Sequence, residues 1–343
     1  MTRPTTHHSS NRPARRHVLA AAAAAATVLG LGALHSTAAL AQAQAPAYPS
    51  KTITFVVPFA AGSATDQLAR ALGQAITNDT KQPVVIDNKA GASGMIAAAA
   101  VAKAPADGYT VLITTNTTHA ANEHLYKKLS YDPVKDFAPL TGLGKGGQVL
   151  VVNAASPHKT VADLVAFAKK NPGKLSFGSG SSSSRVAGEM FKQMAGVEIL
   201  HVPYRSNPFA ITDLLAGQID MMITDTSTGV PQVKAGKLNA LGYSTQKRSA
   251  QLPDVPTIDE AGVKGYDMGY WFAAYAPAGT PAPVVARLNQ LLGAATQSTA
   301  AKNFFDNAGS EAWRTTPDDL AKFQAAETVK WGKVIKAAGI EAE

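Results

Sequence analysis

The sequence predicts an α/β fold in two lobes. Short β-rich runs alternate with helical patterns along the chain, which is typical of mostly parallel sheets with helices on both faces. About 300 residues follow an N-terminal targeting segment, and one hydrophobic core rarely serves that many. Several strands also end in small polar residues that open directly into a helix, which is where open α/β sheets bind ligands.

Residues 1–45 are predicted to be a signal peptide. Arg15 and Arg16 precede an apolar run from Val18 to Leu34, and Ala-x-Ala sites follow it. A basic start, a short apolar stretch and small residues at the end mark a cleaved secretory signal, not a membrane span. The arginine pair partly matches a twin-arginine signal. A general secretory signal that contains two arginines is the alternative, and the sequence leaves both open.

The remaining chain is only weakly basic. Four of the 32 basic residues lie in the signal peptide and none of the 24 acidic ones does. The chain without the signal peptide therefore has 28 basic and 24 acidic residues and a net charge of +4. That excess does not predict binding to nucleic acid. The chain has no cysteine, which excludes disulfides, thiol nucleophiles and thiolate metal sites. No long apolar run follows the signal, so a soluble exported protein is expected.

The first predicted strand, Ile53–Val57, leads through Pro58 and small residues into a helix. Leu68, Leu72 and Ile76 fall on one face of that helix, the spacing of a buried side. The start of a helix leaves backbone N–H groups free and carries the positive end of the helix dipole. This strand–turn–helix unit is therefore predicted to bind an anion.

Further strands and helices alternate behind this unit. A capping box at Thr160-x-x-Asp163 and the pair Thr280-Pro281 mark two helix starts, and a last helix is expected from Leu320 to Ala338. The other strands are expected at Val84–Asp87, Thr110–Thr114, Val149–Asn153, Leu175–Gly178, Ile219–Thr224, Leu238–Ser244 and Trp271–Ala276.

A glycine-rich run, Gly142 to Gly147, gives the clearest candidate boundary. Its spacing matches the dinucleotide fingerprint, but that motif must follow a strand and open a helix, whereas this run precedes a strand. A flexible crossing between lobes is the preferred interpretation. We therefore expect residues 46–145 and 245–343 to form the first lobe and residues 146–244 to form the second.

A second polar loop, Gly178 to Arg185, resembles the loop of the first strand–turn–helix unit. It lies between a strand and a helix, and its glycine amides and serine hydroxyls can surround a carboxylate with donors. A flexible serine linker is the alternative. Arg185 could pair with a ligand carboxylate or could be an exposed helical arginine.

Two more strand ends carry polar residues. Thr114 to His119 could donate hydrogen bonds to a ligand or could cap the helix that follows. Asp225 follows the strand that ends at Thr224. Carboxylates such as Asp66 and Asp225 repel an anion, so they would have to accept from a ligand amine or hydroxyl. Asp66 could equally cap the amides of its own helix.

The templates of enzymes and metal sites are missing from the sequence. It holds no Gly-x-Ser-x-Gly elbow, no phosphate-loop lysine motif and no His-Glu-x-x-His. His119 and His124 are five residues apart and thus lie on different faces of a helix, so no metal site is expected there. Neither a cofactor nor a catalytic residue is predicted.

A set of ordered motifs runs through the chain from Tyr48 to Glu343. The motifs are Tyr48-Pro-Ser-Lys-Thr-Ile, Val57-Pro-Phe-Ala-Ala-Gly62, Ala106-Asp-Gly-Tyr109, Tyr131-Asp-Pro-Val-Lys-Asp-Phe137, His201-Val-Pro-Tyr204, Asp213-Leu-Leu-Ala-Gly-Gln-Ile-Asp220, Lys234-Ala-Gly-Lys-Leu238, Leu252-Pro-Asp-Val-Pro-Thr257 and Ala276-Pro-Ala-Gly-Thr-Pro281. Together these motifs resemble the Bug-type, TctC-like extracytoplasmic receptors of tripartite tricarboxylate transporters.

The resemblance implies a two-lobed periplasmic binding protein of type II-like fold that closes on a small carboxylate and hands it to membrane permease subunits. It places ligand contacts in the loop from Phe59 to Asp66 and in the serine/glycine loop from Ser179 to Ser184. This chain has Gly62-Ser63 where a Gly-Gly pair is common in the family, and its second loop is unusually rich in serine. Both departures leave the identity of the ligand open.

The preferred function is that of a periplasmic, monomeric solute receptor without cofactor. Trp271 is expected to make the intrinsic fluorescence respond to ligand. One alternative is an exported α/β hydrolase or isomerase with Asp66 or Asp225 as general base, and another is a sensor subunit that presents its ligand to a signalling partner. The residues expected to bind the ligand are Phe59, Gly62, Ser63, Thr65, Asp66, Thr115, Asn116, Ser179, Ser181, Ser182, Ser183, Tyr204, Asp225 and Trp271.

Overall fold

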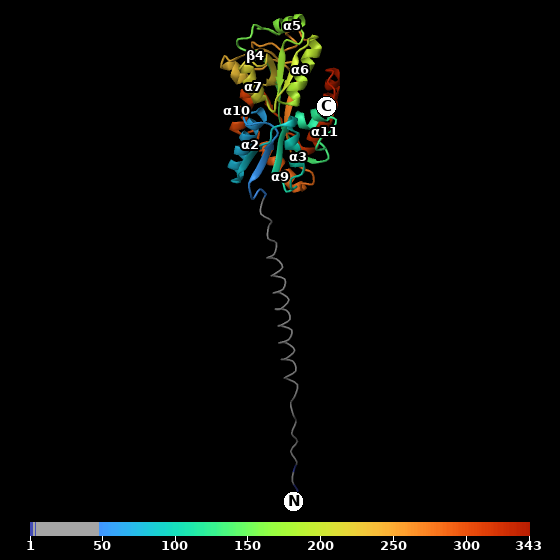
Figure 1. Cartoon of the computed structure of the whole chain (residues 1–343). Helices are drawn as coiled ribbons and strands as arrows, with labels where there is room; N and C mark the ends of the chain where they lie inside the picture. Colours follow the sequence, from blue (N-terminus) through green and yellow to red (C-terminus); the bar gives the residue numbers. More distant parts are fainter. Residues whose placement is uncertain (3, 5–47) are drawn as a thin grey trace. The chain divides into compact units, whose positions relative to one another are not determined.

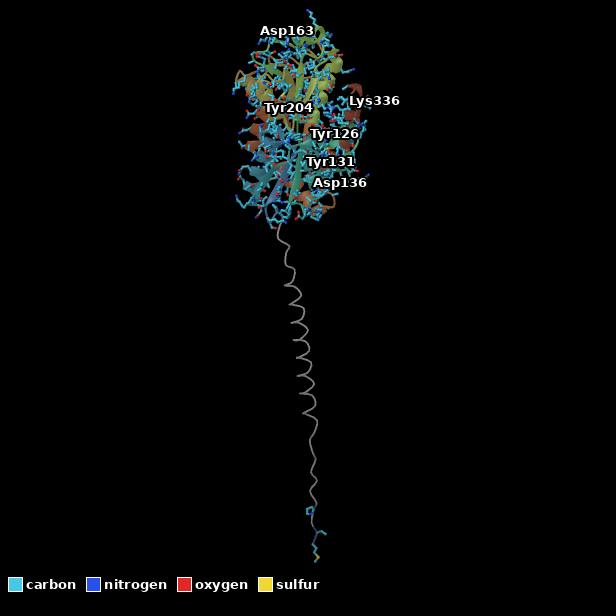
Figure 2. All side chains as sticks on the ribbon, in the orientation of Figure 1. Tyr126, Tyr131, Asp136, Asp163, Tyr204 and Lys336 are labelled. Carbon is cyan, nitrogen blue, oxygen red and sulfur yellow. The ribbon has the colours of Figure 1, made fainter. Side chains whose placement is uncertain are left out.

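The computed structural model describes residues 1, 2, 4 and 48–343, so the signal peptide predicted over residues 1–45 lies almost entirely outside the described residues. Tyr48–Glu343 forms one compact unit in which helices cover a strongly extended sheet system (Figure 1). Side chains fill the space between its layers (Figure 2). Within these described residues no helix has the length and apolarity needed to cross a membrane.

The first half of the sheet system combines parallel and antiparallel strands. β1 (Ile53–Val57) pairs in parallel with β2 (Val84–Asn88) and with β3 (Thr110–Thr115). β3 pairs antiparallel with β9 (Gly269–Pro277), and β9 pairs antiparallel with the first part of β4 (Phe137–Asn153). A short strand, β10 (Glu311–Ala312), pairs antiparallel with the first part of β4. This half is the first lobe.

The second half begins within β4. From Gln148 onward β4 pairs antiparallel with β7 (Met221–Asp225) and with β8 (Leu238–Tyr243). β5 (Ser176–Ser179) then pairs in parallel with β7 and with β6 (Leu200–Pro203). β4 thus changes partners between Gly147 and Gln148, so that a single strand connects the two halves of the sheet system. The two-lobed α/β fold agrees with the prediction.

Helices separate nearly all of these strands, as the alternating pattern predicts. They are α2 (Ala64–Thr80), η1 (Ala92–Gly94), α3 (Met95–Ala102), η2 (Thr117–Ala121), α4 (Asn122–Leu125), α5 (Val161–Lys170), α6 (Ser182–Ala195), α7 (Asn207–Leu215), α8 (Thr226–Lys234), α9 (Ala282–Ala295), α10 (Thr299–Ala308) and α11 (Pro317–Ala337). In Figure 1, α2, α3 and α9 gather at one end of the unit and α5, α6 and α7 at the other.

The glycine-rich run belongs to β4 and leads to the point where this strand crosses between the halves of the sheet system, but it is a paired strand, so its predicted flexibility was wrong. Residues Gly142 to Gly147 pair with β9, with register shifts on the way. The glycines make room for neighbouring side chains. A Cβ on Gly142 would lie 2.4 Å from the Trp313 ring, and one on Gly144 would lie 2.6 Å from the Phe305 ring. The run is glycine-rich because aromatic rings pack directly on its backbone.

The buried apolar residues run through both lobes. One cluster combines first-lobe residues such as Leu112 and Ala121 with second-lobe residues such as Leu164 and Phe177. The segment from Thr245 to Met268, predicted with the first lobe, packs on the second: Tyr266 donates its hydroxyl hydrogen bond to the Ala187 carbonyl of α6. The two lobes therefore share a continuous core beside the crossing strands.

Candidate functional site

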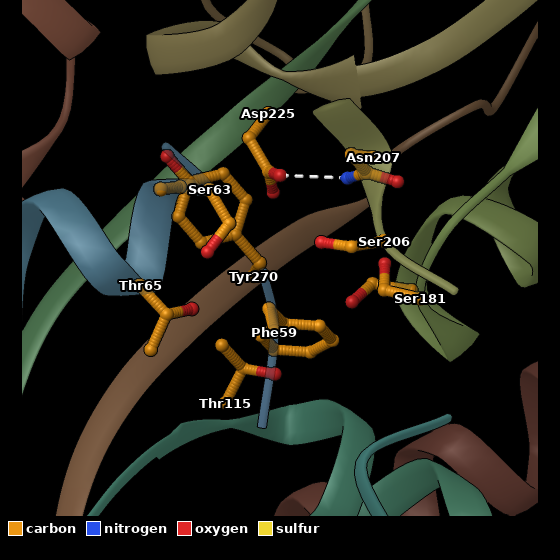
Figure 3. A pocket seen from close by; sticks show the side chains of 11 residues that line it. Phe59, Ser63, Thr65, Thr115, Ser181, Ser206, Asn207, Asp225 and Tyr270 are labelled. Carbon is orange, nitrogen blue, oxygen red and sulfur yellow. Dashed lines mark hydrogen bonds between the residues drawn. The ribbon is translucent and has the colours of Figure 1, made fainter. Parts of the chain in front are cut away.

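A small cavity lies where the loops of the two lobes meet (Figure 3). In this closed arrangement a water-sized sphere has about 10 Å³ in which to move, which is room for about one water molecule. The residues that line it are Phe59, Ser63, Ala64, Thr65, Thr115, Ser181, Ser183, Ser206, Asn207, Asp225 and Tyr270. The lining contains no lysine, arginine or histidine.

Four helices begin at this cavity, and the N-cap residue of each one lines it. The N-caps are Ser63 of α2, Ser181 of α6, Ser206 of α7 and Asp225 of α8. The first turn of a helix leaves backbone N–H groups without intrahelical partners and carries a partial positive charge. Four such ends direct partial positive charge into one small space, which would favour an anion there although no cationic side chain lines it.

The Ser63 hydroxyl of the lining keeps a hydrogen available for a ligand. Ser63 Oγ accepts from the Asp66 amide at 3.3 Å, and Ser181 Oγ accepts from the Ser184 amide at 3.2 Å in a capping box. Since the hydroxyl of Ser63 only accepts in this contact, its own hydrogen can be donated into the cavity. The local sequence Ser-x-x-(polar) thus builds both the helix start and a donor.

Hydrogen bonds join the two lobes beside the cavity. Ser206 Oγ accepts from the backbone amide of Ala60 at 3.2 Å. The hydroxyls of Thr117 and Ser183 are hydrogen-bonded at 3.1 Å. Ser182 Oγ donates to Asn122 Oδ1 at 2.6 Å. These contacts connect the first-lobe loops to the starts of α6 and α7, which is the arrangement of a closed cleft.

Asp225 is the only carboxyl group of the lining. Asn207 Nδ2 donates to Asp225 Oδ2 at 2.7 Å (Figure 3). The amide of Asn207 is held in this orientation because its Oδ1 accepts from the Gly180 amide at 2.9 Å and from Ser184 Oγ at 3.1 Å. Burial raises the pKa of the Asp225 carboxyl above its ordinary value, against the hydrogen bond from Asn207.

Asp66 lies next to the cavity but does not line it. Its carboxylate accepts from the Gly62 amide at 2.9 Å, from Asn88 Nδ2 at 3.0 Å and from Arg70 Nε at 3.0 Å. Burial opposes ionisation, but these bonds, the one from Arg70 first, hold its pKa below the ordinary value. The ionised Asp66 therefore fixes the loop that holds Gly62, whose φ of +80° suits glycine.

The side chains of three further predicted residues form hydrogen bonds with other protein groups and do not line the cavity. Ser179 Oγ is bonded to His201 Nε2 at 2.7 Å, and burial together with Arg185 lowers the pKa of that histidine to about 4. Tyr204, labelled in Figure 2, donates to Asp213 at 2.7 Å. Ser182 bonds Asn122, as described above. Arg185 pairs with Glu343 at 2.6 Å.

Trp271 and Asn116 are also outside the lining. The Trp271 indole donates to Glu327 at 3.1 Å and packs edge-on against Phe323 of α11. Asn116 Oδ1 accepts from the Trp271 backbone amide at 3.4 Å. Successive residues of a strand face opposite sides, so the residue of β9 that lines the cavity is Tyr270. The ring expected to report on ligand thus lies on the opposite face of that strand.

The lining combines predicted and unpredicted residues. Seven of its members were expected from the sequence, namely Phe59, Ser63, Thr65, Thr115, Ser181, Ser183 and Asp225. Ala64, Ser206, Asn207 and Tyr270 were missed. Ser206-Asn207-Pro208 is a helix-start signal, but β6 ahead of it is too short and polar to stand out as a strand.

A family model described as "Tripartite tricarboxylate transporter family receptor" matches residues 68–340. The chain belongs to this family. A protein encoded in the tcbD-tcbE intergenic region of Pseudomonas sp. strain P51 is 37% identical to the receptor over 96% of this chain and 97% of its own length. The protein BugT of Bordetella pertussis is 32% identical over 90% of this chain and 96% of its own.

Solved structures agree with this assignment. Rpa4515 of R. palustris, solved with adipate, has a TM-score of 0.83 and 38% identity and covers 86% of the receptor and all of its own chain. The periplasmic binding protein BugD has a TM-score of 0.83 and 32% identity with the same coverage. MatC from Rhodopseudomonas palustris, solved with malate, has a TM-score of 0.80 and 31% identity over 84% of the receptor and all of MatC.

The family and the solved structures decide whether the chain is a binding protein or an enzyme. The receptor has the fold of a periplasmic binding protein and is a solute-binding protein, not a hydrolase or isomerase. Asp66 and Asp225 consequently need no role as general bases. No group of three or more metal-ligating side chains occurs among the residues that the structure describes.

Proposed function

We propose that this receptor captures a small organic carboxylate in the cavity between its lobes. The convergence of the N-termini of α2, α6, α7 and α8 on one cavity carries the proposal. Free amides and hydroxyls there can surround a carboxylate with donors while no cationic side chain is needed. Adipate and malate in two relatives are ligands of this chemical class.

Closure of the lobes would bury the ligand. Both lobes contribute to the cavity, Ser63 and Thr65 from one and Ser181 and Ser183 from the other. A ligand that touches both loops binds the closed form better than the open form and thereby shifts the equilibrium toward it. We keep the predicted lobes, 46–145 with 245–343 and 146–244, as a proposal, with the return crossing shifted to the start of β9 because residues 245–268 pack on the second lobe.

A thermal-shift screen of the mature protein against mono-, di- and tricarboxylates and amino acids tests capture, since a ligand specific for the folded state raises the unfolding midpoint. Ser63→Ala and Ser298→Ala form a matched pair. Both serines are N-caps whose hydroxyl accepts an amide, but only Ser63 lines the cavity. Loss of one ligand hydrogen bond, about 0.5–1.5 kcal/mol, should weaken binding roughly two- to tenfold in Ser63→Ala alone. A flat screen, or equal loss in both variants, would contradict the proposal.

We further propose that the receptor delivers its ligand to the membrane permease of a tripartite tricarboxylate transporter. The family assignment supports this partner. Uptake of the labelled ligand found in the screen should fall to background when either the receptor or the permease gene is deleted. Normal uptake without the receptor, together with a changed transcriptional response to the ligand, would favour the sensor alternative.

Export to the periplasm is part of the same proposal. N-terminal sequencing of the periplasmic protein should find cleavage near residue 45. Replacing Arg15 and Arg16 by lysines keeps their charge, so it should block a twin-arginine signal and spare a general secretory one. The readout is the amount of uncleaved precursor that remains in the cytoplasm.

A further inference from the structure

Asp225 poses a problem for any carboxylate ligand. It is the only carboxyl group that lines the cavity, and the lining contains no lysine, arginine or histidine to offset its charge. A ligand carboxylate held by the helix N-termini would lie in the same small cavity as Asp225. Two like charges at such short range in a poorly solvated space repel each other strongly. A ligand that carries a hydrogen-bond donor for Asp225 would remove this repulsion.

The hydrogen bonds around Asp225 show what that group must be. Asn207 donates to Oδ2 and cannot turn its amide around, because its own oxygen already accepts from the Gly180 amide and from Ser184. Oδ1 receives no hydrogen bond from any other residue in the described part of the chain. A carboxylate oxygen in this position has free acceptor capacity beside the space in which a ligand would lie.

We propose that Asp225 is the specificity residue of the cavity and selects carboxylic acids that carry a hydrogen-bond donor of their own, a hydroxyl or an ammonium group. This inference rests on the proposed capture of a small carboxylate. The ligand carboxylate would take the donors of the helix starts, and its hydroxyl or ammonium would donate to Asp225. An ammonium would also neutralise the buried charge, so amino acids should bind more tightly than hydroxy acids.

The raised pKa of Asp225 agrees with an uncompensated buried charge. It also allows a rival arrangement in which Asp225 takes up a proton and donates to an unsubstituted acid. The two arrangements differ in their response to Asp225→Asn. An asparagine has no charge to repel a plain carboxylate and accepts from an ammonium only as a neutral group, so it should erase the selection that we propose.

Calorimetric titration of the mature protein at neutral pH tests the inference with acids of matched length. The probes are propionate, lactate and alanine, then succinate, malate and aspartate, and then adipate, 2-hydroxyadipate and 2-aminoadipate. Within the series that binds, the hydroxy or amino acid should bind on the order of ten- to hundredfold more tightly than the plain acid, the range of a charge-assisted hydrogen bond. In Asp225→Asn this ratio should fall close to one while the plain acid binds more tightly.

Asp213→Asn provides a matched control, because Asp213 also accepts a side-chain hydrogen bond, from Tyr204, but does not line the cavity. It should leave the ratio unchanged, and thermal unfolding checks that both variants fold. A ratio that Asp225→Asn does not alter, or a native protein that prefers plain acids, would overturn the inference while capture of carboxylates stands. Absence of binding in all three series would overturn both.

Discussion

Replacing Gly180 by alanine should disable the candidate site, although Gly180 itself does not line the cavity. A Cβ on Gly180 would lie 2.0 Å from the backbone carbon of Ser206 and 2.1 Å from the nitrogen of Asn207, whereas ordinary contacts begin at 3.4 Å. The Ser206–Asn207 backbone would have to retreat by about 1.4 Å, the difference between 3.4 and 2.0 Å. Both neighbours are backbone atoms, so no side-chain rotation relieves the clash.

This displacement acts on the site through two residues. Ser206 would lose its bond to the Ala60 amide, which joins the lobes, and Asn207 would lose its bond from the Gly180 amide, which aims it at Asp225. Loss of two neutral hydrogen bonds costs about 1–3 kcal/mol, so affinity should fall roughly five- to 150-fold. Overpacking should lower the free energy of unfolding by about 1–3 kcal/mol as well.

Titration calorimetry and urea unfolding of the same preparation separate the two effects. Gly217→Ala is a suitable control, because Gly217 has a φ of +71° and nothing within 4 Å of an added Cβ. Its variant should lose about 1 kcal/mol of stability through backbone strain and keep its affinity. If Gly180→Ala binds as tightly as the native protein, the close approach of the two loops does not position the site, and the reasoning fails.

Three other substitutions test the surroundings of the site. Burial lowers the pKa of His119 to about 3; the unfolded chain therefore takes up the proton first, and stability is lost as the pH falls from about 6.5 toward 3, by roughly 2.5 kcal/mol at pH 4.5. His119→Phe should remove this loss in urea unfolding at pH 7 and 4.5; an equal loss in the variant would refute it. Gly142→Ala should cost about 1–3 kcal/mol in the same assay, because its Cβ would meet the Trp313 ring, and an unchanged midpoint would show that β4 adjusts. Arg70→Met should lower the free energy of unfolding by about 1–3 kcal/mol, because a buried oxygen of Asp66 loses a donor, and it should weaken carboxylate binding a few-fold. Unaltered affinity would show that the Arg70–Asp66 ion pair does not position the first loop.

Local patterns explain why much of the fold could be predicted. The helical spacing of apolar residues in α2 and the β-rich run Ile53–Val57 can each be recognised within a short stretch of sequence. Both elements occur where they were predicted. Capping residues act over three positions, so the start of α5 at Thr160 is also visible in the sequence. β6 and the first part of β4 escaped because they lack a run of β-forming residues, and their pairing partners lie far away in the chain.

The candidate site also combines features that follow from local sequence with features that depend on contacts between distant residues. Local sequence patterns predicted which loops follow strands and open helices, and Ser63, Ser181 and Asp225 of those loops do line the cavity. It could not choose between Tyr270 and Trp271, because a one-residue shift reverses the faces of a strand. The meeting of four helix starts in one cavity, the orientation of Asn207 toward Asp225 and the packing of aromatic rings on the glycines of β4 all arise from tertiary packing. Those outcomes depend on distances between residues remote in sequence, which no local period encodes.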